Sequence, residues 1–359
     1  MKKVFESHCH YHLFDSSVED DKNLLKEEFK ITETEKVCFL SIPQQFNQDG
    51  KKEIDPIHNL RGIFLKKAFS PNAYAFAGLV HPNNYLNSEE VSNDFLKQVK
   101  KYYDMGFDGM KMLEGYPTFI KYAGIGINSP IFDKFYDFCE KNNFPITMHI
   151  ANPDENWDIK TASEEAIQEG RVYDESFPSK EEITAQMFDI LKKFPNLHLT
   201  LAHMGFFSNH YDDAIIFMSY PNTRLDVTPG GEQLINMSKK WDVWSKFFDK
   251  YQDRILYGSD YYPFEKGEYW LIAVNRRPGF LRELFETDGE HQYLGESFKG
   301  VKLDETILDK IYMQNATNLL GAPKKINSGL ILNEIESCKN NIDSKYLNDL
   351  EIIRSAFTN

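Results

Sequence analysis

The sequence has little cysteine and no long hydrophobic run. Its four cysteines, among 359 residues, are widely spaced without a C-x-x-C pair, which argues against a disulfide framework and a thiolate zinc site. No window is apolar enough to span a bilayer, and Met1-Lys2-Lys3 leads into a polar segment instead of the apolar core of a signal peptide. These absences predict a cytoplasmic protein with reduced thiols.

Positive charge is also scarce, since 41 Lys and Arg residues face 55 Asp and Glu residues and give a net charge of −14. A protein that binds nucleic acid or an anionic membrane needs a basic face for the phosphate groups. The content of hydrophobic residues, 41%, is typical of a folded globular protein. We therefore expect a small-molecule partner and neither a nucleic acid nor a membrane, while a homo-oligomer stays open.

Eight short apolar segments alternate with helical patterns along most of the chain. The expected strands are residues 3–7, 36–42, 73–80, 108–113, 144–150, 196–203, 223–228 and 254–260. Among the helices between them, 88–105 shows the clearest amphipathic spacing, and Gly106 is its expected C-cap. A doubly wound open sheet would normally carry a glycine fingerprint after its first strand, and none is present. The alternation therefore predicts an α/β fold of the (β/α)8 TIM barrel type.

The predicted barrel forms a single domain over residues 1–321. Two long loops follow the fifth and eighth strands, at 151–179 and 261–302. Residues 322–359 lie beyond the closing helix, and their hydrophobic spacing predicts a C-terminal helical extension that packs on the barrel or on a second subunit.

Polar side chains gather at the carboxyl ends of the predicted strands, where barrel active sites are built. Residues two apart on a strand project from one face, so His8 and His10 can bind a single ion, with His10 and His12 as the alternative pair. The residues at the ends of the other strands are Lys111, His149, His203 and Asp260. A buried cluster of imidazoles and a carboxylate is energetically costly without a partner, and a divalent cation is the simplest partner. The predicted cation is zinc, or alternatively manganese, iron or nickel.

At these positions the sequence resembles the amidohydrolase superfamily, in its branch of amidohydrolase-related metal-dependent hydrolases and decarboxylases. The resemblance covers about the first 320 residues. The motifs that carry it are Glu6-Ser7-His8-Cys9-His10, Gly106-Phe107-Asp108-Gly109-Met110-Lys111, Thr147-Met148-His149, Leu201-Ala202-His203-Met204-Gly205, Leu256-Tyr257-Gly258-Ser259-Asp260 and Asn315-Ala316-Thr317-Asn318-Leu319-Leu320-Gly321. One departure is Glu6, where the family usually has Asp.

The resemblance implies a ligand set and two catalytic roles. His8, His10 and His149 would bind the metal, with Asp260 as a further ligand or as a neighbour of the activated water. Asp260 is then the natural general base, and His203 would orient the water or stabilise the developing oxyanion. The mononuclear branch favours one metal, most simply zinc.

Lys111 has two alternative roles. It would be a cation for a substrate carboxylate, or, in a binuclear site, a carbamylated bridge between two metals. Further candidates for substrate binding are His81, Glu114, Tyr261 and Arg276, which follow predicted strands or overhang the barrel mouth. For His81 a structural, hydrogen-bonded role is an equal alternative.

The leading functional hypothesis is a metal-dependent hydrolase that acts on a small, carboxylated ester, lactone or amide. The alternative is a metal-dependent non-oxidative decarboxylase or hydratase of the same superfamily. A third hypothesis from a different class is a catalytically silent barrel that binds a ligand. The sequence does not identify the substrate.

Overall fold

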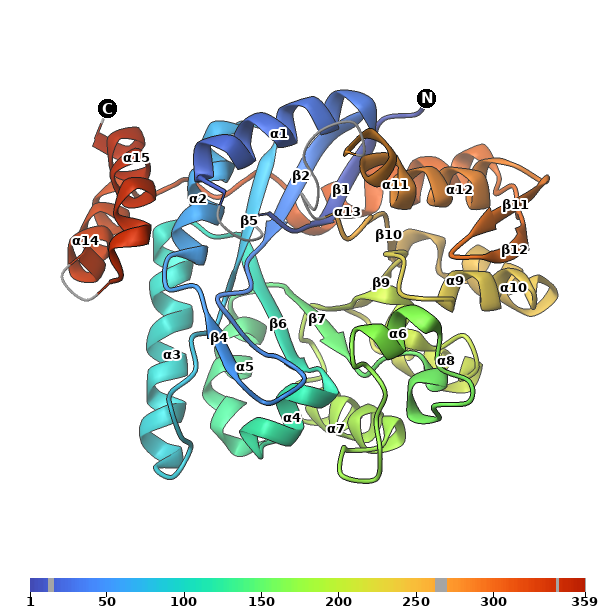
Figure 1. Ribbon diagram of the computed structural model, residues 1–359, viewed down its shortest axis with the longest axis horizontal. Helices are drawn as coiled ribbons and strands as arrows, with labels where there is room; N and C mark the ends of the chain where they lie inside the picture. Colours follow the sequence, from blue (N-terminus) through green and yellow to red (C-terminus); the bar gives the residue numbers. More distant parts are fainter. Residues whose placement is uncertain (12–15, 262–269, 340–341, 359) are drawn as a thin grey trace.

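The computed structural model of the chain is a nearly closed barrel of eight parallel strands surrounded by helices (Figure 1). It describes residues 1–11, 16–261, 270–339 and 342–358. The strands, in their order around the sheet, are β1 (Val4–Cys9), β2 (Thr34–Leu40), β5 (Ala73–Gly78), β6 (Gly109–Gly115), β7 (Ile146–Ile150), β8 (Leu199–Leu201), β9 (Thr223–Asp226) and β10 (Ile255–Leu256). All eight predicted strands are present, and the single-domain TIM barrel is confirmed.

The last and first strands approach each other and nearly complete the barrel. The backbone N–H of Ser7 donates to the carbonyl of Tyr257 at 3.1 Å, and that of His10 donates to Tyr261 at 2.9 Å. The end of β1 is thereby fixed beside the segment that follows β10. Residues from the two ends of the sequence can therefore share one site.

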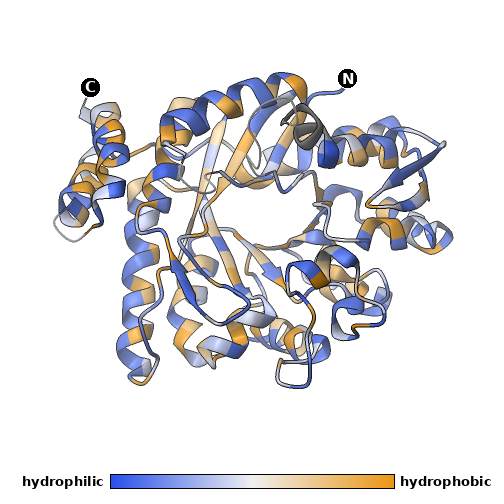
Figure 2. Ribbon diagram, in the orientation of Figure 1, coloured by the Kyte–Doolittle hydropathy of each residue, from blue (hydrophilic) through white to orange (hydrophobic). Residues whose placement is uncertain are grey.

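The helices around the barrel also follow the predicted order. They are α1 (Val18–Ile31), α2 (His58–Ala68), α3 (Ser88–Met105), α5 (Asp133–Lys141), α7 (Lys180–Lys193), α8 (Tyr211–Ser219), α9 (Gln233–Ser238), α10 (Trp241–Tyr251), α12 (Glu305–Asp309) and α13 (Asn315–Leu320). Figure 2 shows hydrophobic residues along the strands and hydrophilic residues on outer helix faces such as that of α3. The core thus lies inside the sheet and between the sheet and its helices.

Local chemistry explains the bounds of α3. The side chain of Asn87 accepts the N–H of Glu90 at the N-terminus, and Gly106 ends the helix with a φ of 98°. A left-handed residue of this kind is tolerated best by glycine. Val91 and Phe95 are buried on the inner face, which is the amphipathic pattern that the sequence predicts.

Several elements are not predicted by the sequence pattern. They are the hairpins β3 (Gln44–Phe46) with β4 (Lys52–Ile54) and β11 (Glu290–Tyr293) with β12 (Glu296–Lys299), and the helices α4 (Pro117–Ala123), α6 (Glu164–Gln168) and α11 (Trp270–Glu286). The hairpin strands are largely exposed, so they lack the alternation of a half-buried strand. In addition, the sequence pattern over residues 233–250 predicts one helix, whereas the structure has two, α9 and α10.

The C-terminal residues form two helices, α14 (Ser328–Lys339) and α15 (Leu347–Thr358), at the edge of the barrel (Figure 1). α14 contacts α3, and α15 contacts α1 and α2. Their hydrophobic sides are buried at Ile331, Ile335, Leu350 and Ile353. Among the helices that the structure describes, none is long and apolar enough to cross a membrane.

Candidate active site

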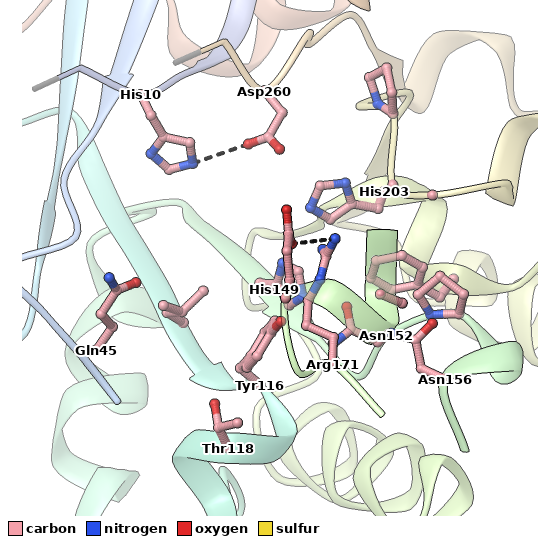
Figure 3. Close-up of a pocket in the computed structure, with 18 of the residues that line it drawn as sticks. His10, Gln45, Tyr116, Thr118, His149, Asn152, Asn156, Arg171, His203 and Asp260 are labelled. Carbon is pink, nitrogen blue, oxygen red and sulfur yellow. Dashed lines mark ion pairs between the residues drawn. The ribbon is translucent and has the colours of Figure 1, made fainter. Parts of the chain in front are cut away.

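A cavity of about 420 Å³ opens at the carboxyl ends of the strands. Strand-end residues line its floor, and residues of the β3–β4 hairpin, the 151–179 loop and α11 line its walls. Figure 3 shows His10 and Asp260 facing each other, with His149 and His203 side by side nearby. The volume is in the range of sites for small molecules.

His8 and His10 project from the end of β1 into this cavity, and hydrogen bonds fix both rings. The Nδ1 of His8 lies 2.8 Å from Oδ2 of Asp226, and the Nδ1 of His10 lies 3.1 Å from the carbonyl oxygen of Leu40. Both partners are acceptors, so each Nδ1 carries a proton and each Nε2 carries a lone pair. The two Nε2 atoms lie 3.2 Å apart.

Asp260 supplies the third donor. Its Oδ1 lies 3.3 Å from Nε2 of His10 and 3.5 Å from Nε2 of His8. Gly258 allows this approach, because a Cβ at that position would lie 2.7 Å from the Cβ of His8. Arg277 on α11 donates to Oδ2 of Asp260 at 2.7 Å. Burial opposes the ionisation of Asp260, but Arg277 and the neighbouring histidines together hold the pKa of this carboxyl well below its usual value.

These three donors fit a divalent cation. The donor atoms of His8, His10 and Asp260 all lie within 4.8 Å of one another. Burial lowers the pKa of His8 to about 4 and also lowers that of His10, so both rings are neutral at pH 7. Two lone pairs and a carboxylate oxygen at these distances repel one another unless a cation lies between them. A neutral imidazole with its other nitrogen hydrogen-bonded is the usual form of a histidine ligand.

Lys111 lies at the same point of the barrel. It belongs to β6, its side chain is buried, and its Nζ lies 3.2 Å from Nε2 of His8. Burial lowers the pKa of Lys111 to about 8. The amine is therefore within reach of the donor set and is easier to deprotonate than an exposed lysine.

His149 and His203 lie in the same cavity, with ring centroids 4.8 Å apart. The Nε2 of His149 lies 3.1 Å from the carbonyl oxygen of Ala151, so Nδ1 is the nitrogen that can bind a cation. The Nδ1 of His203 lies 3.3 Å from the carbonyl oxygen of Thr228, which leaves a lone pair on Nε2. Burial lowers the pKa of both, to about 4 for His203.

The remaining sequence candidates lie elsewhere or at the rim. His81 and Glu114 contact each other, with Nε2 and Oε1 2.7 Å apart, and neither is among the described residues that line the cavity. Tyr261 is buried and pairs with the end of β1, whereas Arg276 lines the mouth, where its guanidinium lies 5.8 Å from the ring centroid of Tyr293. His12 lies outside the described residues.

Asp226 and Arg171 are among the residues of the site that are absent from the set selected by sequence. Asp226 ends β9 and contacts His8, and this contact holds the pKa of Asp226 below its usual value although burial opposes it. Its position at a strand end is the signal that could have identified it. Arg171, in the loop after β7, lines the cavity and pairs with Glu169. No local pattern distinguishes this arginine from an exposed one.

Glu6, the departure from the family pattern, supports the site from below. Its carboxylate accepts the backbone N–H of His8 at 2.9 Å and that of Ser259 at 3.0 Å. Burial raises the pKa of Glu6 to about 7. The longer side chain therefore still links β1 to the segment that carries Asp260.

A family model with the description Amidohydrolase matches residues 91–322 of the chain. No curated protein matches the sequence. The fold is similar to an uncharacterised TIM-barrel protein from Bordetella bronchiseptica (13% identity, TM-score 0.54, covering 89% of this chain and 98% of that one). It is also similar to 2,6-dihydroxybenzoate decarboxylase from Rhizobium (15% identity, TM-score 0.52, covering 89% of this chain and 99% of that one). A third similar structure is 4-oxalomesaconate hydratase from Rhodopseudomonas palustris (13% identity, TM-score 0.51, covering 94% of this chain and 98% of that one). At these identities the likeness concerns the fold alone.

Proposed function

The chain belongs to the amidohydrolase family, and from this membership we propose that it is a metal-dependent hydrolase of a small, carboxylated ester, lactone or amide. The observation that carries the proposal is the convergence of two histidine lone pairs and one carboxylate oxygen in a buried cavity. The proposed location is the cytoplasm and the proposed partner is a small molecule.

The residues proposed to hold the metal are His8, His10 and Asp260. His149 lies in the same cavity but outside this group of three, and it is the proposed fourth ligand through its Nδ1. Nitrogen and carboxylate donors suit zinc, and they also accept manganese, iron or nickel. A divalent cation in this position would supply a Lewis acid that lowers the pKa of water towards neutrality and polarises a substrate carbonyl.

Asp260 and His203 are the proposed catalytic residues. Asp260 is ionised at neutral pH because Arg277 holds its pKa low, so its carboxylate can accept a proton from water. His203 is neutral and presents a lone pair on Nε2. That nitrogen can accept a hydrogen bond from water but cannot donate one to an oxyanion. Of the two roles that the sequence suggests for His203, the geometry favours the orientation of water.

Lys111 and the arginines at the mouth are the proposed partners of the substrate carboxylate. Lys111 lies next to the donor set, whereas Arg276 lies at the rim. A short substrate would therefore contact Lys111 alone, and a longer substrate would contact both residues. With a pKa of about 8, Lys111 is largely an ammonium ion at pH 7. This charge supports the role as a carboxylate partner over the alternative of a carbamylated bridge in a binuclear site.

Metal analysis and a substrate panel test the proposal. The protein loaded with zinc or manganese should bind about one ion per chain and hydrolyse some member of a panel of carboxylated esters, lactones and amides. His8→Ala and His10→Ala should each lose the ion and the activity. His198→Ala is the matched control, because His198 precedes β8 at the opposite, amino end of the strands.

The outcomes separate the three hypotheses. Wild-type protein without bound metal, or turnover unchanged in His8→Ala, contradicts the proposal. Release of carbon dioxide without net addition of water identifies a decarboxylase, and addition of water to a double bond identifies a hydratase. Saturable ligand binding without any turnover identifies a silent binding barrel.

A further inference from the structure

One buried carboxylate connects three parts of the site. Asp226 ends β9, is 1% exposed, and uses its two oxygens for different partners. Oδ2 lies 2.8 Å from Nδ1 of His8. Oδ1 accepts the backbone N–H of His203 at 2.9 Å, the backbone N–H of Thr228 at 3.1 Å and the hydroxyl of Thr228. The carboxylate is therefore fixed by donors on one oxygen and faces the histidine with the other.

The partner of Nδ1 decides which nitrogen of His8 carries the proton. A carboxylate can only accept, so Nδ1 donates and Nε2 keeps its lone pair. Nε2 is the atom that faces His10, Asp260 and Lys111, at 3.2 Å, 3.5 Å and 3.2 Å respectively. In the other tautomer a proton would point into this group of donors, and His8 could not bind a cation.

We propose that Asp226 is the positioning residue that selects the cation-binding tautomer of His8. This inference rests on the proposed metal-dependent function, because the tautomer matters only if His8 is a ligand. Asp226 itself does not touch the cation or the substrate in this scheme. It acts through His8 and holds the turn at His203, where φ is 55°, with the same carboxylate.

Substitution by asparagine separates these two actions. Oδ1 of Asp226 has three donors around it, so in Asp226→Asn the amide oxygen should take that place and keep the His203 turn intact. The amide NH₂ must then face Nδ1 of His8. Because an NH₂ group can only donate, His8 is forced to carry its proton on Nε2. Asp226→Asn should therefore fold normally and bind metal weakly.

The test combines a tautomer measurement with a metal titration, neither of which needs turnover. In metal-free protein, ¹⁵N NMR of the histidine rings, with His8 assigned by its absence in His8→Gln, should show a protonated Nδ1 in the wild type and a protonated Nε2 in Asp226→Asn. Titration with cobalt(II), followed by its visible absorption, should show at least a tenfold weaker affinity for the variant. Thr228→Ser is the matched control, since it keeps the hydroxyl that donates to Oδ1 and lies 3.2 Å from Nδ1 of His8, and therefore leaves the Oδ2 contact and the tautomer unchanged.

Each result is decisive. A wild-type His8 protonated on Nε2 overturns the inference even if no variant folds, and so does an Asp226→Asn protein that binds cobalt as tightly as the wild type. Wild-type protein with the expected tautomer and no cobalt binding instead contradicts the proposed metal-dependent function. A loss of affinity of the same size in Thr228→Ser would show that general disruption, not the tautomer, causes the effect, and would also overturn the inference.

Discussion

Asp349 links α15 to the barrel through its buried carboxylate, and removal of this carboxylate should strongly destabilise the docking of the helix. Asp349 is 4% exposed, and its Oδ2 accepts from Nε and Nη2 of Arg61 on α2 at 3.0 Å and 2.8 Å. Its Oδ1 accepts the first N–H of α1, that of Val18, at 3.2 Å. Arg61 is also buried and has a second partner, Asp55.

The magnitude follows from the groups left without a partner. Breaking a buried ion pair costs about 3–5 kcal/mol, and the remaining contact with Asp55 reduces this to about 2 kcal/mol. The unpaired N–H of Val18 adds about 1 kcal/mol. Asp349→Ala should therefore destabilise the docking of α15 by about 3 kcal/mol, and Asp349→Asn, which keeps an acceptor for Val18, by about 2 kcal/mol.

Hydrogen exchange followed by mass spectrometry measures this difference locally. About 3 kcal/mol corresponds to roughly 100-fold faster exchange of the α15 amides in Asp349→Ala. Glu351→Gln is the control on the same helix, because Glu351 is exposed and lies 3.9 Å from its partner, Arg354. If α15 exchanges at the wild-type rate in both Asp349 variants, the buried ion pair does not hold the helix and the reasoning is refuted.

Two further predictions concern the site and its surroundings. Gly258→Ala should weaken metal binding by about tenfold or more, because the new Cβ displaces His8. Gly279→Ala is the control, since no atom lies within 4 Å of its added Cβ and metal binding should not change. Equal affinities of the two variants in a cobalt titration would contradict this prediction. Burial alone would raise the pKa of Asp154, but the hydrogen bond from His210 and the ion pair with Lys180 together outweigh burial, and the pKa is lowered. The carboxylate of Asp154 therefore stabilises the fold above its unfolded pKa, near 4, and loses this contribution as the pH falls towards the folded pKa. In urea unfolding, the difference between wild type and Asp154→Asn should be constant above about pH 5 and shrink below about pH 4, and a pH-independent difference would count against the assignment.

The order of the elements follows from the sequence because the patterns that specify them are local. A buried parallel strand is a short apolar run, and a helix such as α3 shows its periodicity, its N-cap and its C-cap glycine within 20 neighbouring residues. Elements without a buried face show no such hydrophobic pattern, and for this reason the β3–β4 and β11–β12 hairpins are not predicted. Likewise, the division of the expected 233–250 helix into α9 and α10 depends on packing.

The residue types of the site were also accessible from the sequence. The H-x-H spacing places His8 and His10 on one face of a strand, and the strand-end rule adds Lys111, His149 and Asp260, which the structure brings to one cavity. The same rule also selected His81 and Glu114, which contact each other outside the cavity lining. Position along a strand therefore identifies candidates but does not determine which side chains meet.

What the sequence alone determined is thus the barrel, its family and the presence of histidines and a carboxylate at the strand ends. Only the tertiary structure decided how these groups are paired: His8 with Asp226, 218 residues away, and Asp260 with Arg277. The physical reason is that tautomers and ionisation states depend on through-space partners and burial, which no local pattern encodes. For this chain, the nitrogen that His8 presents to a cation is set by a carboxylate on β9, which the near-closure of the barrel brings to the end of β1.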